Sequence, residues 1–595
     1  MLQTLKKYWN YDNFRPLQAE IIQSILDGRD TLALMPTGGG KSLCFQVPTM
    51  VMNGLCLVIT PLIALMKDQV ENLKKRDIRA AAIYTGITYE QQKTALDNCM
   101  WGPYHFLYVS PERLESEEFR ERLSRLPICL IAVDEAHCIS QWGYDFRPSY
   151  LKIAEIRDII ANNAASNSSQ RASNNQVPIL ALTATATPNV VDDIQERLAF
   201  REKHVLRKSF SRANLSYVVR QTNKKADEIV HILNRVSGSA IVYVRNRQRT
   251  QEIAAYLNEN GISADFYHAG LTSKERSAKQ EAWKSNLTRV IVATNAFGMG
   301  IDKADVRVVI HHDLPDTIEA YFQEAGRAGR DEQKAFAVLL YDPSQDKAKA
   351  RKRVADNYPE EEFLHTVYHK TCNYLGVGAD SGQGATFFLD VNDLCRKMHL
   401  PIIPTYSALH LLSQMGYLTF DEEQEIRPRV MIRVQRRDLD NYTLTADQAE
   451  LLEGLMREYT GIFTELQYIK GGQQSCSLED ASLQNGGNAA YCLEAKRHEL
   501  LVSLAQKGII SYVPQTTANV LRLTVNRQAE IRVPEHFYTG RKTHYVEKLK
   551  AMIEYADNQQ FCRSQVLLSY FGEDDAEVCG TCDVCRAKKR ESSHQ

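Results

Sequence analysis

The chain has 595 residues, a length typical of about four domains. Apolar residues make up 44% and charged residues 24%, which excludes a wholly disordered chain. The formal net charge of −1 excludes a generally basic coat, so any surface for nucleic acid must be local. No apolar run reaches the ~18 residues that span a bilayer, and the first residues show no apolar leader, so we expect no membrane segment. The 13 cysteines lie mostly among apolar neighbours, which is typical of reduced thiols in a cytosolic protein.

The first informative segment is 11–18, about one helix before a glycine-rich loop. The ring of Tyr11 and the guanidinium of Arg15 can sandwich an adenine, and the Gln18 amide can pair with its edge. The alternative is a plain helix start with Pro16 at an early helical position. Beside a phosphate loop, the adenine interpretation is favoured.

The loop itself follows a short apolar run at 31–35 that predicts a buried strand, and a helix is expected from Leu43. Consecutive glycines let several backbone N–H groups converge on phosphate oxygens. Lys41 adds charge for the β- and γ-phosphates, and the Ser42 hydroxyl is placed to bind Mg²⁺. The alternative is a glycine-rich turn that binds nothing. The residues of this predicted ATP-binding loop are Thr37, Gly38, Gly39, Gly40, Lys41 and Ser42.

Apolar strands then alternate with polar helices from 55 to 114, the rhythm of a parallel sheet covered on both faces. Two segments, 60–63 and 110–113, fall just after strands. Loops at the carboxyl ends of such a sheet line the ligand crevice. We therefore expect Ser110 and Arg113 at a binding surface.

A second apolar strand, 129–133, ends in two carboxylates. Asp134 is placed to hold Mg²⁺ directly or through water, and Glu135 to polarise the attacking water as general base. The combination of Gly-Lys-Ser with Asp-Glu-Ala-His resembles the superfamily 2 helicases.

The next segment, 140–148, is similar to the aromatic-rich loop of the RecQ family, which in that family couples single-stranded DNA contact to ATP hydrolysis. Trp142 and Phe146 offer faces on which bases stack, and Arg147 can meet a phosphate. Tyr144 stands where many relatives have histidine, and its role is left open. A core-packing loop is the alternative that three aromatic residues also allow.

Residues 162–176 are rich in Asn, Ser and Ala and predict an inserted surface loop. The strand that follows, 179–187, resembles the family motif that links the ATP site to strand separation. A boundary is expected near 200–210, before a second α/β unit with strands at 240–244 and 289–294. This unit has no second phosphate loop, so it should close over the nucleotide of the first.

Segments 294–302 and 323–330 are very close to RecQ motifs. Arginine suits transition-state charge on a γ-phosphoryl group because it is permanently charged and fork-shaped. By the resemblance, Arg330 is the better candidate for the arginine finger. The resemblance also assigns the following residues: Gln323 and Arg327 to catalysis, Asp302 to the nucleotide and Thr294 to DNA.

Residues 344–540 give a weaker signal. Two short helices within 388–416 and a strand at 417–420 suggest a winged helix. The segment 427–437 then has five arginines and no acid, and alternation would place Arg427, Arg429 and Arg433 on one face of a strand. A phosphate-contacting wing is favoured, with an ordinary solvated strand nearly as well supported. A helix and strand at 494–513 suggest a second winged-helix-like unit.

The C-terminal segment has an apolar helical stripe from Tyr545 to Ala556, followed by four cysteines in close spacing. Such spacing is typical of tetrahedral Zn²⁺ sites and here resembles the RecQ zinc-binding module; reduced thiols are the alternative. The predicted ligands are Cys562, Cys579, Cys582 and Cys585. In most relatives this module directly follows the second lobe, whereas here about 200 residues intervene. We therefore expect loss of the metal to leave the ATPase core folded.

The predicted fold is α/β, with two RecA-like parallel-sheet lobes, a winged-helix-like region and a small zinc-binding helical module. The expected domains are lobe 1 at 1–205, lobe 2 at 206–343, the winged-helix-like region at 344–540, the zinc module at 541–590 and a tail at 591–595. By resemblance, this is an ATP-dependent 3′–5′ DNA helicase of recombination and repair. An RNA helicase and a non-catalytic nucleic-acid-binding scaffold are the alternatives. The expected partners are single-stranded and tailed or forked duplex DNA and a single-stranded-DNA-binding protein, in the cytoplasm at the nucleoid.

Overall fold

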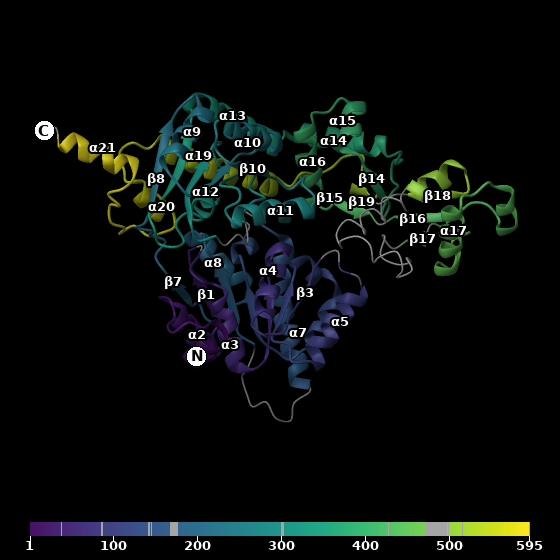
Figure 1. The fold of residues 1–595 in the computed structure, drawn as a ribbon, viewed down its shortest axis with the longest axis horizontal. Coiled ribbons are helices and arrows are strands. Elements are labelled where there is room, and N and C mark those ends of the chain that lie inside the picture. Colours follow the sequence, from purple (N-terminus) through teal and green to yellow (C-terminus); the bar gives the residue numbers. More distant parts are fainter. Residues whose placement is uncertain are drawn as a thin grey trace. The chain divides into compact units, whose positions relative to one another are not determined.

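The fold is described from a computed structural model of the chain (Figure 1). It describes residues 1–36, 38–84, 87, 89–140, 143, 146–166, 177–298, 303–426, 428–465, 467–469, 497, 499–513 and 516–593. These residues form two compact units, Met1–Arg351 with Thr543–Gln595, and Lys352–Lys542. No helix in the described ranges is long and apolar enough to cross a membrane.

The first lobe is a seven-stranded parallel sheet in the order β3-β4-β2-β5-β6-β1-β7, with helices packed on it. Its strands are β1 (Thr31–Leu34), β2 (Leu55–Ile59), β3 (Ala80–Ile83), β4 (Phe106–Val109), β5 (Ile128–Val133), β6 (Ile179–Thr183) and β7 (Val205–Arg207). Its helices are α1 (Leu2–Trp9), α2 (Gln18–Leu26), α3 (Leu43–Met52), α4 (Ile63–Lys74), α5 (Tyr89–Trp101), α6 (Glu117–Ser124), α7 (Ile153–Ser166) and α8 (Pro188–Arg197), with 3₁₀ turns η1 (Pro111–Glu115), η2 (Ala136–Ile139) and η3 (Pro148–Lys152). β1, β2, β4 and β6 are buried along their whole length, as continuous apolar runs covered on both faces should be.

The second lobe is a six-stranded parallel sheet in the order β10-β11-β9-β12-β13-β8. Its strands are β8 (Leu215–Gln221), β9 (Ser239–Tyr243), β10 (Ala264–Tyr267), β11 (Val290–Ala293), β12 (Val306–His311) and β13 (Ala335–Tyr341). Its helices are α9 (Lys225–Arg235), α10 (Arg247–Glu259), α11 (Ser273–Lys284), α12 (Ile318–Ala325) and α13 (Pro343–Asn357). The prediction of two RecA-like lobes is confirmed.

The C-terminal helices are α19 (Glu535–Asp557), α20 (Arg563–Tyr570) and α21 (Asp583–Ser592). We call residues 543–593 the cysteine module. Its apolar side chains, among them Met552, Tyr555 and Phe571, belong to the same buried cluster as the strands of the two lobes. Phe571 lies 5.0 Å from Phe322 between ring centroids. The module is therefore part of the first unit, although the sequence separates it from lobe 2.

The second unit contains two separate cores. Its outer part has α14 (Glu361–Tyr374), α15 (Val391–Met398) and α16 (Ile402–Gln414), packed on a sheet of β14 (Thr386–Leu389), β19 (Thr516–Leu523) and β15 (Leu418–Ile426). Its inner part has β16 (Arg429–Ile432), η4 (Arg436–Asn441), α17 (Ala446–Glu458), β17 (Gln467–Tyr468) and β18 (Ile510–Val513). Both sheets are antiparallel.

The inner part is inserted into the hairpin of the outer part. β15 and β19 are antiparallel partners, and Ile426 pairs with Thr516 at their far end. The segment 427–515 is therefore inserted between the paired ends of β15 and β19. The winged helix stays a prediction for the outer part, and residues 499–513 of the expected second unit lie in the sequence between β15 and β19, the two strands of its hairpin.

Candidate functional site

The phosphate loop connects β1 to α3, as the sequence predicts. Gly38 has φ 81° and Gly40 has φ 77°, backbone conformations that side chains with a Cβ rarely adopt. A Cβ atom at Gly40 would also collide with the amide nitrogen of Gln18. The two glycines thus allow the tight turn that opens the N-terminus of α3 towards a phosphate.

Two predicted adenine-binding side chains form hydrogen bonds with the backbone of this loop. The Gln18 amide donates to the carbonyl oxygens of Gly40 at 3.0 Å and Gly39 at 3.3 Å. The Arg15 guanidinium donates to the carbonyl oxygen of Gly38 at 2.6 Å. Tyr11, in contrast, is 53% exposed. The structure thus brings Arg15 and Gln18 to the loop, and their contact with adenine stays a prediction.

The two predicted carboxylates lie at the end of β5, facing the loop. Lys41 Nζ lies 3.8 Å from Glu135 Oε1. Burial and, to a smaller extent, the neighbouring charge of Glu135 together raise the pKa of Asp134 to about 6. A divalent cation would stabilise both anions, so the pair is suited to holding Mg²⁺ together with Ser42.

Glu135 has a strained backbone, with φ 47° in a residue that is not glycine. Its Oε2 atom lies 3.4 Å from Nδ1 of His137, and that ring nitrogen lies 2.9 Å from Oγ1 of Thr183. Thr183 ends β6, the strand of the segment that resembles the coupling motif. His137 is therefore a link between the candidate base and that motif. His137 is the last residue of the Asp-Glu-Ala-His motif, and no pattern in the sequence predicted this role for it.

The candidate arginine finger comes from the second lobe. A Cβ atom at Gly38 would lie 3.3 Å from Cγ of Arg330, so this arginine lies directly against the phosphate loop. Arg327 is only 5% exposed and donates to the carbonyl oxygen of Gly298. Gln323, in the last turn of α12, is 7% exposed. Of these three residues, Arg330 is the one that lies against the phosphate loop, and its contact with a γ-phosphoryl group stays a prediction.

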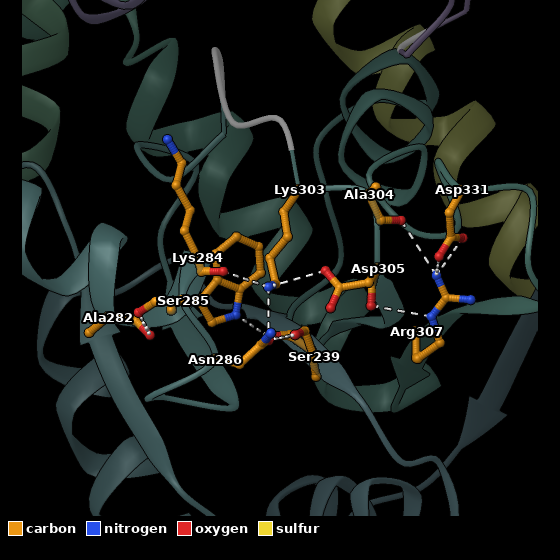
Figure 2. A network of polar contacts seen from close by, with 12 residues as sticks. Ser239, Ala282, Lys284, Ser285, Asn286, Lys303, Ala304, Asp305, Arg307 and Asp331 are labelled. Carbon is orange, nitrogen blue, oxygen red and sulfur yellow. Dashed lines mark hydrogen bonds and ion pairs between the residues drawn. The ribbon is translucent and has the colours of Figure 1, made fainter.

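A polar network anchors the chain on both sides of this motif (Figure 2). Arg307 binds both carboxylate oxygens of Asp331 at 2.6 Å, which fixes the residue directly after Arg330. Lys303 is 7% exposed and donates to Asn286 Oδ1 at 2.8 Å and to a carbonyl oxygen at the end of α11 at 2.9 Å. Arg307 thus holds the backbone directly after the finger, and Lys303 ties the segment before β12 to the end of α11.

The described residues of the predicted DNA surface are held largely by backbone contacts. Arg113 donates to the carbonyl oxygen of Tyr84 at 2.9 Å, and the Arg147 backbone N–H donates to Cys138 at 2.8 Å. Ser110 and Thr294 each follow a strand and are 2% and 7% exposed. Phe146 is half-buried. The predicted residues that lie outside the described part of the chain are Thr37, Trp142, Tyr144, Asp302 and Arg427.

The four predicted metal ligands form one cluster. The Sγ atoms of Cys562, Cys579, Cys582 and Cys585 all lie within 4.8 Å of one another. Cys579 and Cys585 are separated by 4.0 Å between sulfurs, too far for a disulfide and close to the roughly 3.8 Å that tetrahedral Zn–S bonds of ~2.3 Å require. Backbone N–H groups of Cys579, Cys582 and Cys585 donate to sulfurs of the cluster at 3.3–3.4 Å. Such donors favour thiolates, so the donor set fits Zn²⁺.

Comparison with known proteins agrees with this site. Residues 15–194 match the DEAD/DEAH box helicase family, 224–332 the helicase conserved C-terminal domain, and 527–586 the RecQ zinc-binding family. The chain is 41% identical over 372 residues to a probable ATP-dependent DNA helicase RecS of Bacillus subtilis, covering 61% of this chain and 71% of that protein. The chain belongs to the RecQ family. It is also 42% identical over 384 residues to the ATP-dependent DNA helicase RecQ of Haemophilus influenzae, covering 63% of this chain and 60% of that protein.

The similarity to these relatives thus covers most of the motor but not the whole chain. The match spans only about 60% of the length of the Haemophilus RecQ, and 56% of a Bacillus subtilis RecQ that is 41% identical. The three matched family segments leave 333–526 unassigned. This interval contains most of the second unit.

Proposed function

We propose that the chain is an ATP-dependent DNA helicase that unwinds duplex DNA in the 3′ to 5′ direction. The observation that carries the proposal is the position of Arg330 of lobe 2 against Gly38 of the phosphate loop in lobe 1. An ATPase site shared between two lobes makes hydrolysis depend on their closure, and this dependence is how a motor converts ATP into movement.

Each residue has a stated part in the proposed hydrolysis. The loop N–H groups and Lys41 bind the phosphates, while Ser42 and Asp134 hold Mg²⁺. Glu135 takes a proton from the attacking water, and Arg330 stabilises the charge that develops on the γ-phosphoryl oxygens. His137 orients Glu135 through its contact with Thr183.

The proposed partner is single-stranded DNA at a tailed or forked duplex. The loop around Phe146 and Arg147 would stack bases and bind phosphate, and its backbone tie to Cys138 supports coupling to the adjacent Asp-Glu-Ala-His segment. The proposal includes one Zn²⁺ in the cysteine cluster, work on chromosomal DNA in the cytoplasm and contact with a single-stranded-DNA-binding protein.

Strand separation by the full chain is the test. We expect unwinding of a 3′-tailed DNA duplex with ATP and Mg²⁺, and little unwinding of a 5′-tailed DNA duplex or an RNA duplex. Glu135→Gln should bind ATP normally but lose about 10²–10⁴-fold in turnover, because only the general base is removed. Equal unwinding of RNA would move the substrate to RNA, and normal turnover in Glu135→Gln would reassign the base.

A further inference from the structure

Two described helices of the second unit, α15 and α16, add no lysine or arginine that lacks an acidic partner. α16 contains no lysine or arginine. On α15, the Arg396 and Lys397 side chains both form ion pairs with Asp393. A run of positive residues lies instead on the inserted part, where 429–437 contains four arginines and no acid; of these, Arg437 forms an ion pair with Asp438 at 3.9 Å. The insert therefore offers a surface for contact with a polyanion.

β16 presents this charge on one face of a three-stranded sheet. Val430 and Ile432 point into the core, with 0% and 1% exposed. Arg429, directly before Val430, points to the other face, where it pairs with Tyr468 on β17 and Val513 on β18. The alternation of inward and outward side chains expected from the sequence is thus correct for Arg429. Because β16 is the central strand, Arg429 lies between Tyr468 and Val513 in a row across the sheet.

Two aromatic rings flank this arginine. The Arg429 guanidinium lies 5.6 Å from the ring centroid of Tyr468 and 5.9 Å from that of Phe388, which comes from β14 of the other sheet. Tyr468 is 59% exposed and Phe388 is 54% exposed. Rings of this size are normally buried on folding, so two of them exposed around one cation mark a surface built for contact.

The Arg429 guanidinium also has a donor nitrogen that is not used within the described residues. Its Nε atom is buried and has no hydrogen-bond partner among the described residues. Guanidinium groups bind phosphate oxygens strongly. Every nucleobase has a flat face that can stack on an aromatic ring, so such stacking does not depend on the DNA sequence. Bases inside a duplex do not offer their faces. The combination of rings and guanidinium therefore fits unpaired bases with their phosphates.

We propose that Phe388, Arg429 and Tyr468 form a stacking site for unpaired DNA bases, a proposal that rests on the proposed function. The site joins the inserted part to the sheet that it interrupts, so strand contact depends on both parts of the unit. It holds single-stranded DNA independently of ATP. Arg433, Arg436 and Arg437 continue the positive surface along the phosphates that follow.

Packing between the two parts is the alternative explanation of the same contacts. In that case loss of the rings would lower stability and leave DNA binding unchanged. The two explanations differ in what a ring-preserving change does. Tyr468→Phe keeps the stacking face, whereas Tyr468→Leu keeps much of the apolar volume without it.

The experiment measures equilibrium binding of the full chain, without nucleotide, to a 3′-tailed DNA duplex with 2-aminopurine in its tail. Stacking of this base on a ring changes its fluorescence. We expect Phe388→Ala/Tyr468→Ala to weaken binding about ten-fold or more and to abolish the fluorescence change. Tyr468→Phe should bind within about two-fold of wild type, and DNA-free ATPase should be the same in all variants.

Wild-type affinity and fluorescence in the folded double variant would overturn the proposal, as would equal binding by Tyr468→Leu and wild type. Thermal unfolding shows whether the double variant is folded, and Tyr468→Leu serves if it is not. Because binding is measured without ATP, failure of the motor gives a different result: wild type then stacks the base but neither hydrolyses ATP nor unwinds DNA.

Discussion

The cysteine module shares one buried core with the two lobes, whereas the second unit has two cores of its own. Both belong to the C-terminal half of the sequence. This difference shows that distance along the chain does not indicate which segments pack into one core. The module, about 200 residues beyond lobe 2, is part of the motor, and the intervening residues form a separate folding unit.

The module is joined to the parts of the motor that matter most for the proposed cycle. Lys548 forms a buried ion pair with Glu319 on α12, the helix that leads to the arginine finger. Glu573 accepts hydrogen bonds from Ser209 at 2.7 Å and from the Phe210 backbone at 2.8 Å, in the segment between the lobes. Loss of the module should therefore affect both the finger and the lobe connection.

The largest effect is expected from removing the metal. Cys582→Ser should release Zn²⁺, unfold α20 and α21 and lower DNA-free turnover at least ten-fold, because α12 loses its support. Elemental analysis and steady-state ATPase measure the two effects. Cys395→Ser, the same change at a buried cysteine of the second unit, is the control and should alter neither.

From sequence alone, loss of the metal is expected to leave the ATPase core folded, and the shared core adds the prediction that ATP turnover falls. A folded Cys582→Ser protein with normal DNA-free turnover would contradict this prediction. It would also show that the shared core does not transmit the loss to α12.

The next effect concerns the buried ion pair. Lys548→Met leaves the carboxylate of Glu319, 3% exposed, without its partner, so we expect a loss of about 3–5 kcal/mol in the free energy of unfolding. Denaturant unfolding of the first unit measures it. The double variant Lys548→Met/Glu319→Leu should recover most of the loss, because an apolar pair leaves no charge buried. Equal losses in both variants would mean that packing, and not the charge, decides the effect.

A smaller loss is expected from Tyr341→Phe. The Tyr341 hydroxyl at the end of β13 donates to Asp557 Oδ1 of α19 at 2.9 Å. Asp557 keeps its ion pair with Lys347 at 2.8 Å, so the change should cost only about 1 kcal/mol. The same denaturant transition reports it, and no change at all would remove this bond from the connection between module and lobe.

The smallest effect on the motor is expected from the largest deletion. Ile426 and Thr516 face each other across the hairpin, so residues 427–515 can be replaced by an Asn-Gly turn. We expect the winged-helix core to remain folded and DNA-free ATPase to stay within about two-fold of wild type. Circular dichroism and steady-state ATPase are the measurements. A large fall in DNA-free turnover would mean that the insert supports the motor.

The ATP site was largely predictable because its chemistry depends on residues close in sequence. The turn at Gly38 and Gly40 and the carboxylates after β5 are fixed by local backbone and strand order. The cysteine cluster was predictable for the same reason: three of its four ligands lie within seven residues. The family resemblance added Arg330, which no spacing near the loop could indicate.

Tertiary structure decided what depends on distant partners. Only the fold sets Thr183 beside His137, Glu319 beside Lys548 and Phe388 beside Arg429. Each pair joins residues between 41 and 229 positions apart, and no local pattern specifies such a contact. The sequence by itself determined a two-lobed ATPase with a cysteine cluster, because helix starts, strand ends and ligand spacing are local. The tertiary structure determined that the cysteine cluster supports the motor and that the insert interrupts a hairpin. The reason is that apolar side chains far apart in the sequence are buried together.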